Sequence, residues 1–463
     1  MTCSIDVSDL SVFAGQTRLM GPVSFRIAPG DTLVIMGETG AGKSLIAQAI
    51  LGTLPGALRA EGRISINGRR VDGLGPADRA ALWGHEIATL PQEPWRALDP
   101  LMQSFRQVAE AHRFVAGKAP AEARRASADA FAALDLTGAE QRLPGALSGG
   151  MAQRVAFAAA TAGHAPILMA DEPTKGLDAE RHGKVVALLA QVPEAGGTLL
   201  AITHEVAVAR RLGGDIIVLR DGSLVEQGAT ETVLAAPRHG YTRSLLDADP
   251  RNWPDTEPAA TGDWVLKARG IAIERGGKRL IDGFDLTLLA GERLALVGPS
   301  GIGKTTLLDA LAGLLNPARG EVQRSPNLSR HGVQKLYQDP PAAFPHRVPL
   351  DTSLRDVARL HNTSWGDVLS MLGQLGIDPA LLARRPDEVS GGELQRISIA
   401  RALTARPGVL LADEPTSRLD PVTQRETLAL LASIAGSQGI AVVLVTHDRD
   451  IARKWASRTV ALS

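Results

Sequence analysis

Cysteine is nearly absent from this chain of 463 residues, in which Cys3 is the single example. One cysteine excludes disulfide bonds within the chain. It also excludes cysteine-based zinc sites and cysteine-ligated iron–sulfur clusters made by this chain alone. We therefore expect the protein to work in a reducing compartment.

An excess of charge of either sign is also missing. Lys and Arg together number 50, Asp and Glu together number 50, and the formal net charge is zero. The chain as a whole has no field that would draw it to nucleic acid or to anionic lipid, although a local basic patch is compatible with these counts. We expect no nucleic-acid partner.

Long apolar runs are absent as well. No run approaches the roughly 18 residues of a membrane-spanning helix. The first residues lack the basic segment followed by an apolar one that marks a signal peptide. We expect a chain that is soluble by itself and reaches a membrane only through partners. With 44% hydrophobic residues, its length predicts about two to four globular domains.

Two glycine-rich segments stand out, GETGAGKS at Gly37–Ser44 and GPSGIGKT at Gly298–Thr305. Such a turn lets backbone N–H groups face the phosphates of a nucleotide, while Lys43 or Lys304 reaches the outer phosphates and the Ser or Thr hydroxyl binds Mg²⁺. The two segments predict two bound nucleotides.

The flanking residues support this interpretation. Short apolar runs at 32–36 and 293–297 predict buried parallel strands before the loops, and 45–51 and 306–312 predict the helices that follow. Strand, glycine loop, lysine and helix in this order distinguish a phosphate-binding loop from an ordinary turn.

An apolar strand ends in two acids in each half of the chain, at Asp171-Glu172 and at Asp413-Glu414. Acids at the carboxyl edge of a parallel sheet, beside a phosphate loop, point to Mg²⁺ as their partner. We expect the first acid of each pair to hold the ion through water. We expect the second to align or deprotonate the water that attacks the γ-phosphate.

A Ser-Gly-Gly motif precedes a helical pattern in each half, at Ser148–Gly150 and Ser390–Gly392. Small residues at a helix N-terminus present free N–H groups and the positive end of the helix dipole, which suits a phosphate. In both halves the motif lies 23 residues before the first acid of the pair. The recurrence favours a functional motif over a simple helix cap.

The halves are not equal in length. Lys43 and Gln92 are 49 residues apart, whereas Lys304 and Gln338 are 34 apart. The first half uses this extra length for an alternating strand and turn at 62–68, which predicts a small antiparallel sheet that the second half has in trimmed form. We predict a first domain at 1–249, a Pro-rich linker at 250–264 and a second domain at 265–463.

With these motifs in order, the whole chain resembles the ATP-binding cassette (ABC) family. The resemblance implies an α/β fold of two tandem P-loop NTPase domains, each with a mainly parallel core sheet, an antiparallel β subdomain and a helical subdomain. It also implies two ATP molecules with Mg²⁺, sandwiched between the two domains, and two hydrolytic sites.

The resemblance assigns residues to each site. Catalytic roles fall on Glu172, His204, Gln92, Glu414, His447 and Gln338. Metal contacts fall on Ser44, Gln92, Asp171, Thr305, Gln338 and Asp413. Nucleotide binding falls on Phe13, Gly37, Gly40, Gly42, Lys43, Ser44, Ser148, Gly149, Gly150 and Asp178, and on Gly298, Gly301, Gly303, Lys304, Thr305, Thr306, Ser390, Gly391, Gly392 and Asp420. In each sandwich the Ser-Gly-Gly motif comes from the opposite domain.

One asymmetry follows from the same resemblance. The family places an aromatic residue about two dozen positions before the loop to stack on adenine, and Phe13 stands there in the first half. The equivalent position of the second half is Glu274, which cannot stack. We expect looser adenine contact at the second site, with a packing role for Phe13 as the alternative.

Two further segments are similar to the ATPases of oligopeptide, dipeptide and nickel importers, namely 91–100 and the tail at 237–246. This implies two transmembrane permease subunits, an extracytoplasmic substrate-binding protein, and a peripheral position at the cytoplasmic face of the inner membrane. Members of this group often carry a C-terminal cysteine cluster, which this chain lacks. The cargo stays open among peptides, nickel or metal chelates, and small amino-acid conjugates.

A soluble twin-cassette ATPase is the alternative. Translation-factor types use a long charged helical linker and repair types carry zinc cysteines, and neither feature is present here. A subunit of a phosphonate-processing complex resembles the same importer group and is harder to separate from it.

Overall fold

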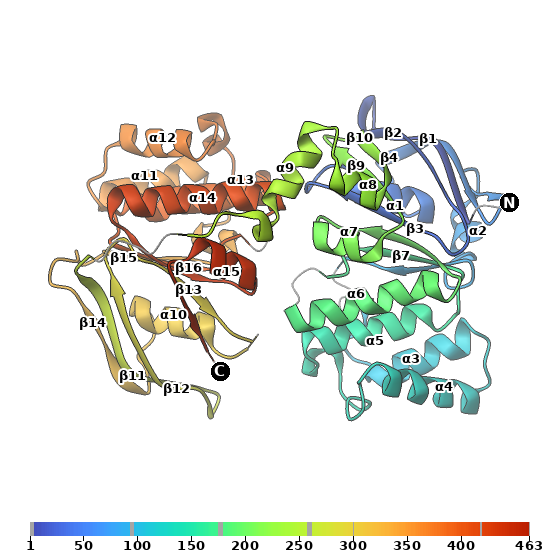
Figure 1. The fold of residues 1–463 in the computed structure, drawn as a ribbon, viewed down its shortest axis with the longest axis horizontal. Helices are drawn as coiled ribbons and strands as arrows, with labels where there is room; N and C mark the ends of the chain where they lie inside the picture. Colours follow the sequence, from blue (N-terminus) through green and yellow to red (C-terminus); the bar gives the residue numbers. More distant parts are fainter. Residues whose placement is uncertain are drawn as a thin grey trace. The chain divides into compact units, whose positions relative to one another are not determined.

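The computed structural model describes residues 4–92, 97–174, 179–256, 262–299, 301–416 and 419–462. The chain divides into a first unit, Met1–Leu246, and a second unit, Asp247–Ser463. Each unit contains two sheets and a group of helices (Figure 1). The two units are described separately below.

The first unit has one antiparallel sheet and one mainly parallel sheet. The antiparallel sheet has the order β2-β1-β4-β5 and consists of β1 (Ile5–Ala14), β2 (Thr17–Ile27), β4 (Leu58–Ile66) and β5 (Arg69–Arg70). The larger sheet has the order β10-β9-β3-β8-β7-β6, with only β10 antiparallel, and consists of β3 (Thr32–Gly37), β6 (Ile87–Leu90), β7 (Ile167–Asp171), β8 (Thr198–Ile202), β9 (Asp215–Arg220) and β10 (Ser223–Ala229).

The helices of the first unit are α1 (Lys43–Leu51), α2 (Pro76–Ala80), α3 (Ser104–Phe114), α4 (Pro120–Ala133), α5 (Gly149–Thr161), α6 (Ala179–Glu194), α7 (Val206–Leu212), α8 (Thr230–Ala235) and α9 (Gly240–Ala248). Helices α3, α4 and α5 pack on one another around Val108, Phe131 and Val155. They form a helical subdomain with its own small core, and Phe105 meets Phe131 edge to face there. The Ser-Gly-Gly motif opens α5 and so belongs to this part.

The second unit repeats the plan with fewer strands. Its antiparallel sheet has the order β12-β11-β14, with β11 (Trp264–Arg275), β12 (Lys278–Leu289) and β14 (Arg319–Arg324). Its core sheet is parallel throughout, in the order β15-β16-β17-β13-β18, with β13 (Arg293–Val297), β15 (Val333–Leu336), β16 (Val409–Asp413), β17 (Ala441–Val445) and β18 (Arg458–Ala461).

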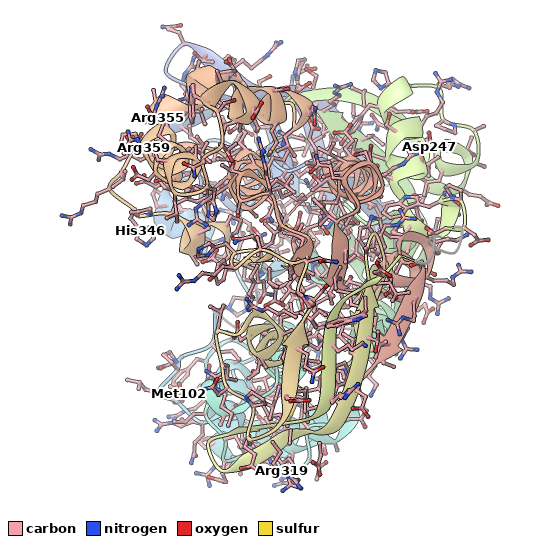
Figure 2. The ribbon with its side chains drawn as sticks, turned by 90° about the vertical axis from the view of Figure 1, so that its left-hand side faces the viewer. Met102, Asp247, Arg319, His346, Arg355 and Arg359 are labelled. Atoms are coloured by element: carbon pink, nitrogen blue, oxygen red, sulfur yellow. The ribbon has the colours of Figure 1, made fainter. Side chains whose placement is uncertain are left out.

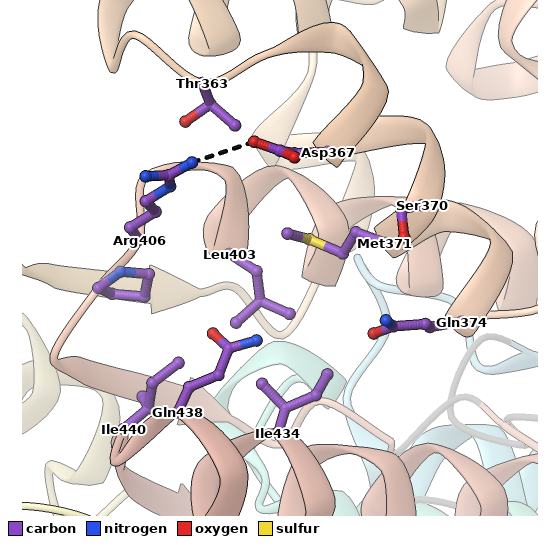
Figure 3. A pocket seen from close by; sticks show the side chains of 11 residues that line it. Thr363, Asp367, Ser370, Met371, Gln374, Leu403, Arg406, Ile434, Gln438 and Ile440 are labelled. Carbon is purple, nitrogen blue, oxygen red and sulfur yellow. Dashed lines mark hydrogen bonds and ion pairs between the residues drawn. The ribbon is translucent and has the colours of Figure 1, made fainter.

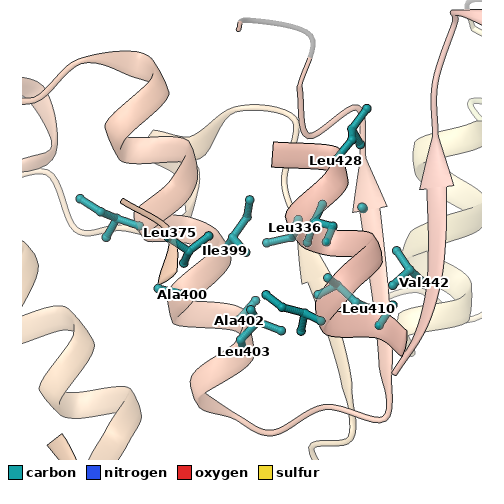
Figure 4. Packing of buried hydrophobic residues seen from close by; sticks show 14 of the residues in the cluster. Leu336, Leu375, Ile399, Ala400, Ala402, Leu403, Leu410, Leu428 and Val442 are labelled. Carbon is teal, nitrogen blue, oxygen red and sulfur yellow. The ribbon is translucent and has the colours of Figure 1, made fainter. Parts of the chain in front are cut away.

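The helices of the second unit are α10 (Lys304–Ala312), α11 (Leu350–Leu360), α12 (Trp365–Gln374), α13 (Gly391–Thr404), α14 (Pro421–Gln438) and α15 (Arg449–Trp455). Helices α11 to α15 meet the core sheet in one cluster that includes Leu336, Ile399, Leu410 and Leu428 (Figure 4), whereas α10 packs through Leu307 and Leu308 in a second cluster. In Figure 2, Arg319 lies at the far end of the antiparallel sheet, and Arg355 and Arg359 lie on the helical part.

The proline-rich segment at 250–256 lies at the start of the second unit and packs against the rest of that unit. A 3₁₀ turn at Pro250–Asn252 lies on α15, and Trp253 after it is buried in the main core of the second unit. The indole Nε1 of Trp253 donates to the carbonyl of Ala248 at 3.2 Å. Asp255 pairs with Lys454 at 2.8 Å. A stretch rich in proline and polar residues is thus anchored by one large apolar side chain.

The expected fold class is confirmed: both units have a mainly parallel core sheet, an antiparallel sheet and a helical part. The strands and helices expected around the two glycine loops are present as β3, α1, β13 and α10. Among the described residues, no helix is both long enough and apolar enough to cross a membrane.

Candidate functional site

Each glycine loop joins the end of a buried strand to the start of a helix. Gly42 and Gly303 stand directly before α1 and α10 with positive φ angles of 89° and 105°, in the region that glycine adopts without strain. At Gly37, a Cβ atom would lie 2.3 Å from the carbonyl oxygen of Leu219 on β9. Only glycine fits at this point, because the neighbouring strand passes so close.

The loop lysines are buried and turn back onto their own loops. Lys43 Nζ donates to the carbonyls of Gly37 and Glu38 at 2.8 and 2.7 Å. Lys304 Nζ donates to the carbonyls of Gly298 and Pro299 at 2.8 and 3.0 Å. Both ammonium groups therefore lie inside the turn in which the sequence predicts the phosphates to bind.

The acid pairs stand at the carboxyl ends of β7 and β16. Each strand is separated from the loop strand of its unit, β3 or β13, by one parallel neighbour, which brings the acids and the loops to the same edge. The second acids, Glu172 and Glu414, have positive φ angles of 45° and 47°. A non-glycine residue in this region is uncommon and is a feature of functional sites.

In the first unit, Glu172 meets two of the predicted site residues. Its Oε1 lies 3.1 Å from His204 Nδ1 and 4.0 Å from Lys43 Nζ. The glutamate side chain is about 10% exposed. The structure thus brings Glu172, His204 and the loop lysine together, while Gln92 is an exposed residue two positions after the end of β6.

In the second unit, Glu414 meets a different pair. Its Oε1 lies 2.5 Å from His447 Nε2, and its Oε2 accepts a hydrogen bond from Gln338 Nε2 at 3.1 Å. Glu414 is thereby held between the histidine and the glutamine that the sequence assigns to the same site.

Asp413 lies beside the second loop. The Thr305 hydroxyl donates to Asp413 Oδ1 at 3.2 Å, as expected if these two oxygens bind one metal ion. Burial raises the pKa of Asp413 above its ordinary value, although Lys335 and the Thr305 hydroxyl both act to lower it.

Lys335 and Asp309 were not among the predicted site residues. Lys335 lies on β15 with its side chain only 5% exposed, and its Nζ lies 2.6 Å from Asp309 Oδ1 on α10 and 3.5 Å from Asp413 Oδ2. The signal in the sequence is a lysine inside the short strand three residues before Gln338. Sequence motifs do not identify Lys335, because the residues around it belong to no motif.

The Ser-Gly-Gly motifs cap α5 and α13. Ser148 Oγ accepts from Met151 N at 3.4 Å. Ser390 and Glu393 form a reciprocal capping box, in which the Ser390 hydroxyl and amide donate to Glu393 Oε2 at 2.7 and 2.8 Å. The hydrogen bond from the Ser390 side chain lowers the pKa of Glu393 below its ordinary value. The second motif is therefore more firmly capped than the first.

The predicted adenine platform has a partner of its own. Phe13 lies on β1, and the Arg59 guanidinium stands 4.8 Å from the centre of its ring. Glu274, the equivalent position on β11, pairs with Arg279 at 3.4 Å. The aromatic asymmetry expected from the sequence is thus present, and the stacking role itself stays a prediction.

Two aspartates that the resemblance assigns to nucleotide binding, Asp178 and Asp420, differ in what the structure describes. Asp178 lies outside the described residues, as do residues 93–96 of the importer-like segment. Asp420 caps α14 by accepting from the amides of Val422 and Thr423, both at 3.1 Å.

A second group missed by the motifs lies next to His204. Glu205 binds the Thr174 hydroxyl at 2.5 Å and His182 Nε2 at 2.7 Å. Burial by itself raises the pKa of Glu205, but the bonds and charges of His182, His204 and Thr174 outweigh it and leave this pKa below its ordinary value. This cluster links α6 to the residues that follow both Glu172 and His204.

The structure also has a cavity of about 430 Å³ in the helical part of the second unit, lined among others by Asp367, Met371, Arg406 and Gln438 (Figure 3). Arg406 and Asp367 form an ion pair at 3.0 Å across it. None of the lining residues belongs to the predicted nucleotide sites, so this cavity is separate from the chemistry described above.

Both halves of the chain match known proteins. The sequence model of the family described as ABC transporter matches residues 20–175 and 281–417. The chain is 33% identical to the peptidoglycan transport ATP-binding protein YejF of Agrobacterium fabrum, over 99% of this chain and 90% of that protein. It is 31% identical to the glutathione import ATP-binding protein GsiA of Salmonella paratyphi A, over 95% of this chain and 81% of that protein.

Solved structures show the same fold. A structure of the RNase-L Inhibitor superposes with a TM-score of 0.65 at 21% identity, covering 98% of this chain and 87% of that one. The archaeal ribosome recycling factor aABCE1, in complex with the stalk protein aP1, superposes with a TM-score of 0.67 at 21% identity, covering 94% and 83%. At this identity the likeness concerns the twin-domain fold alone.

Proposed function

The chain belongs to the ABC transporter family and is an ATPase, and from this premise we propose that it powers an importer of the peptide or nickel type. The observation that carries the proposal is the doubled constellation of loop lysine, strand-end acids and histidine within one chain. Relatives that share this twin arrangement over most of their length are named as transport or import ATP-binding proteins.

The proposed metal sites fit Mg²⁺. In the second unit the hydroxyl of Thr305 and the carboxylate of Asp413 converge, and such hard oxygen donors are those that Mg²⁺ prefers. Ser44 and Asp171 supply the same donor types in the first unit, and Gln92 and Gln338 each add a side-chain amide oxygen. When bound, Mg²⁺ neutralises the charge that develops on the β- and γ-phosphates.

We assign the proton chemistry to the second acid of each pair. Glu172 and Glu414 orient the attacking water and accept its proton. His204 and His447, which meet Glu172 and Glu414 in the structure, are proposed to contact the γ-phosphate. Lys43 and Lys304 turn from loop carbonyls to the outer phosphates when nucleotide binds. A positioned base of this kind contributes about 10²–10⁴-fold to the rate.

Each nucleotide is proposed to lie in a composite site. Lys43, Ser44, Asp171 and Glu172 work with Ser390–Gly392, and Lys304, Thr305, Asp413 and Glu414 work with Ser148–Gly150. ATP binding closes the two domains on each other, and hydrolysis reopens them. Joining both domains in one chain gives this closure a high effective concentration.

Two transmembrane permease subunits and an extracytoplasmic substrate-binding protein are the proposed partners, with this chain at the cytoplasmic face of the inner membrane. We expect its membrane contact to be made through these partners. The cargo names of the relatives, peptidoglycan and glutathione, both denote molecules that contain peptide, which favours a peptide-class cargo over nickel.

Co-purification of the tagged chain with its untagged neighbours tests the proposal. Recovery of two polytopic membrane proteins, together with ATPase activity that they alter, is the expected result. Recovery of ribosomal or DNA-bound material would instead support a soluble twin-cassette ATPase. Recovery of soluble enzymes acting on phosphonates would instead support a subunit of a phosphonate-processing complex.

A further inference from the structure

The buried ammonium group of Lys335 lies beside Asp413, the proposed metal-binding acid of the second nucleotide site. Lys335 is 5% exposed, and Asp413, which it approaches to 3.5 Å, is 3% exposed. A buried lysine needs a negative partner, because an unpaired charge in a desolvated place is costly. Lys335 has two such partners, since Asp309 on α10 lies 2.6 Å from its Nζ.

The first unit has no such pair at the matching positions. Lys335 stands three residues before Gln338, and the residue three before Gln92 is Thr89. Asp309 stands five residues after Lys304, and the residue five after Lys43 is Gln48. Two neutral side chains thus occupy the places that a cation and an anion occupy in the second unit.

The pair is neutral in sum, but its two charges face different groups. Lys335 contacts the Oδ2 atom of Asp413, while the Oδ1 atom accepts from the Thr305 hydroxyl. Asp309 contacts Lys335 from the helix side and is about a third exposed. If Thr305 and Asp413 hold a divalent cation, that cation would share the Asp413 carboxylate with the Lys335 ammonium that the fold already holds there.

We propose that Lys335, held by Asp309, is a positioning residue that fixes the Asp413 carboxylate and makes the second site bind its divalent cation more weakly than the first. The proposal rests on the metal role proposed above for Asp413. Like charges near one carboxylate repel, and screening by water is small between Lys335 and Asp413 because both side chains are buried. The two sites of the chain thereby differ in their affinity for the divalent cation.

Mn²⁺ titration of the full chain tests this, with electron paramagnetic resonance to count free ions and a non-hydrolysable ATP analogue at saturation. We expect two Mn²⁺ ions per chain in two classes that differ about tenfold in affinity. The double variant Lys335→Thr with Asp309→Gln copies the first unit and keeps the net charge. It is expected to merge the two classes into one tight class.

The reciprocal variant, Thr89→Lys with Gln48→Asp, serves as the matched control and is expected to weaken the tight class about tenfold. Two equal sites in the unchanged protein would overturn the proposal even if neither variant folds. An unchanged ratio in a folded Lys335→Thr, Asp309→Gln variant would also overturn it. Binding of fewer than two ions per chain with nucleotide present would overturn the proposed twin-site function and this inference together.

Discussion

The two units use the same motifs but hold their central glutamates differently. Glu172 is met by His204 and the loop lysine, whereas Glu414 is met by His447 and Gln338. Asp413, the proposed metal-binding acid of the second unit, also has a lysine beside it. Equal motifs therefore do not imply equal sites, because residues outside the motifs decide which contacts each motif residue makes.

The largest expected effect concerns these two glutamates. Glu172→Gln and Glu414→Gln should each lower ATP hydrolysis at the site of the changed residue by about 10²–10⁴-fold, the range expected for loss of a positioned base. Because hydrolysis is proposed to reopen the closed domains, each variant should also strongly lower the steady-state rate. Initial rates of phosphate release measure this, with nucleotide binding checked separately. Glu231→Gln, at an exposed residue of α8, is the control and should leave the rate unchanged.

The comparison breaks if the two variants differ. Near-normal turnover in either one would contradict two hydrolytic sites. It would show that the site of the changed glutamate, either Glu172 beside Lys43 or Glu414 beside Gln338, does not hydrolyse ATP.

The next effect concerns stability rather than turnover. Trp253 is 8% exposed and packs in the core of the second unit, so Trp253→Ala should destabilise that unit by about 3–5 kcal/mol, as for other large-to-small core changes. Urea unfolding combined with limited proteolysis measures this unit by unit. Trp83→Ala, at a residue 41% exposed in the first unit, is the control with a smaller expected cost.

If Trp253→Ala left the second unit as stable as before, the segment at 250–256 would be a simple linker, as its composition suggests. The expected loss would instead show that this segment contributes to the stability of the second unit, which then differs from the first in how it completes its core.

A smaller effect separates the units at the adenine ring. Phe13→Ala should weaken ATP binding at the first site about tenfold, within the roughly 1–3 kcal/mol of a base stacked on an aromatic ring, and leave the second site unchanged. Arg59→Ala removes the guanidinium above the Phe13 ring but keeps the ring. It therefore distinguishes loss of the packing partner of Phe13 from loss of the ring that is predicted to stack on adenine. Unchanged nucleotide affinity in Phe13→Ala, measured by calorimetry, would remove the stacking role.

Much of the fold could be predicted because its signals are local. A glycine loop between an apolar run and a helical pattern predicts β3 and α1 from about twenty neighbouring residues. The apolar run before Asp413-Glu414 likewise predicts β16. These patterns follow from backbone turns and burial, which need no distant partner.

The parts that escaped prediction depend on distant partners. Lys335 lies on β15 and pairs with Asp309 on α10 and with Asp413 on β16. Trp253 escaped for a different reason, since proline-rich composition conceals a single anchoring side chain. Pairing across a sheet edge is set by the topology, and no periodicity in the sequence encodes it.

The smallest expected effect concerns the cluster behind His204. Glu205 has a lowered pKa in the folded chain, so its contacts stabilise the first unit above the ordinary value of 4.5, and this stability is lost as the pH falls through the lowered folded value. The second unit has Gln424 and Asp448 at the positions of His182 and Glu205. There Gln424 donates to the Thr416 hydroxyl at 3.1 Å, and Asp448 caps α15.

Glu205→Gln should therefore cost on the order of 1 kcal/mol at neutral pH and nothing below the folded pKa. Amide hydrogen exchange in α7, followed from pH 6 down to pH 3, measures this locally, with α15 of the second unit as the internal reference. If α7 of the unchanged protein and of the variant lost protection in parallel over this range, the Glu205 contacts would contribute no pH-dependent stability. The residues next to His204 and His447 would then not differ in the pH dependence of their stability.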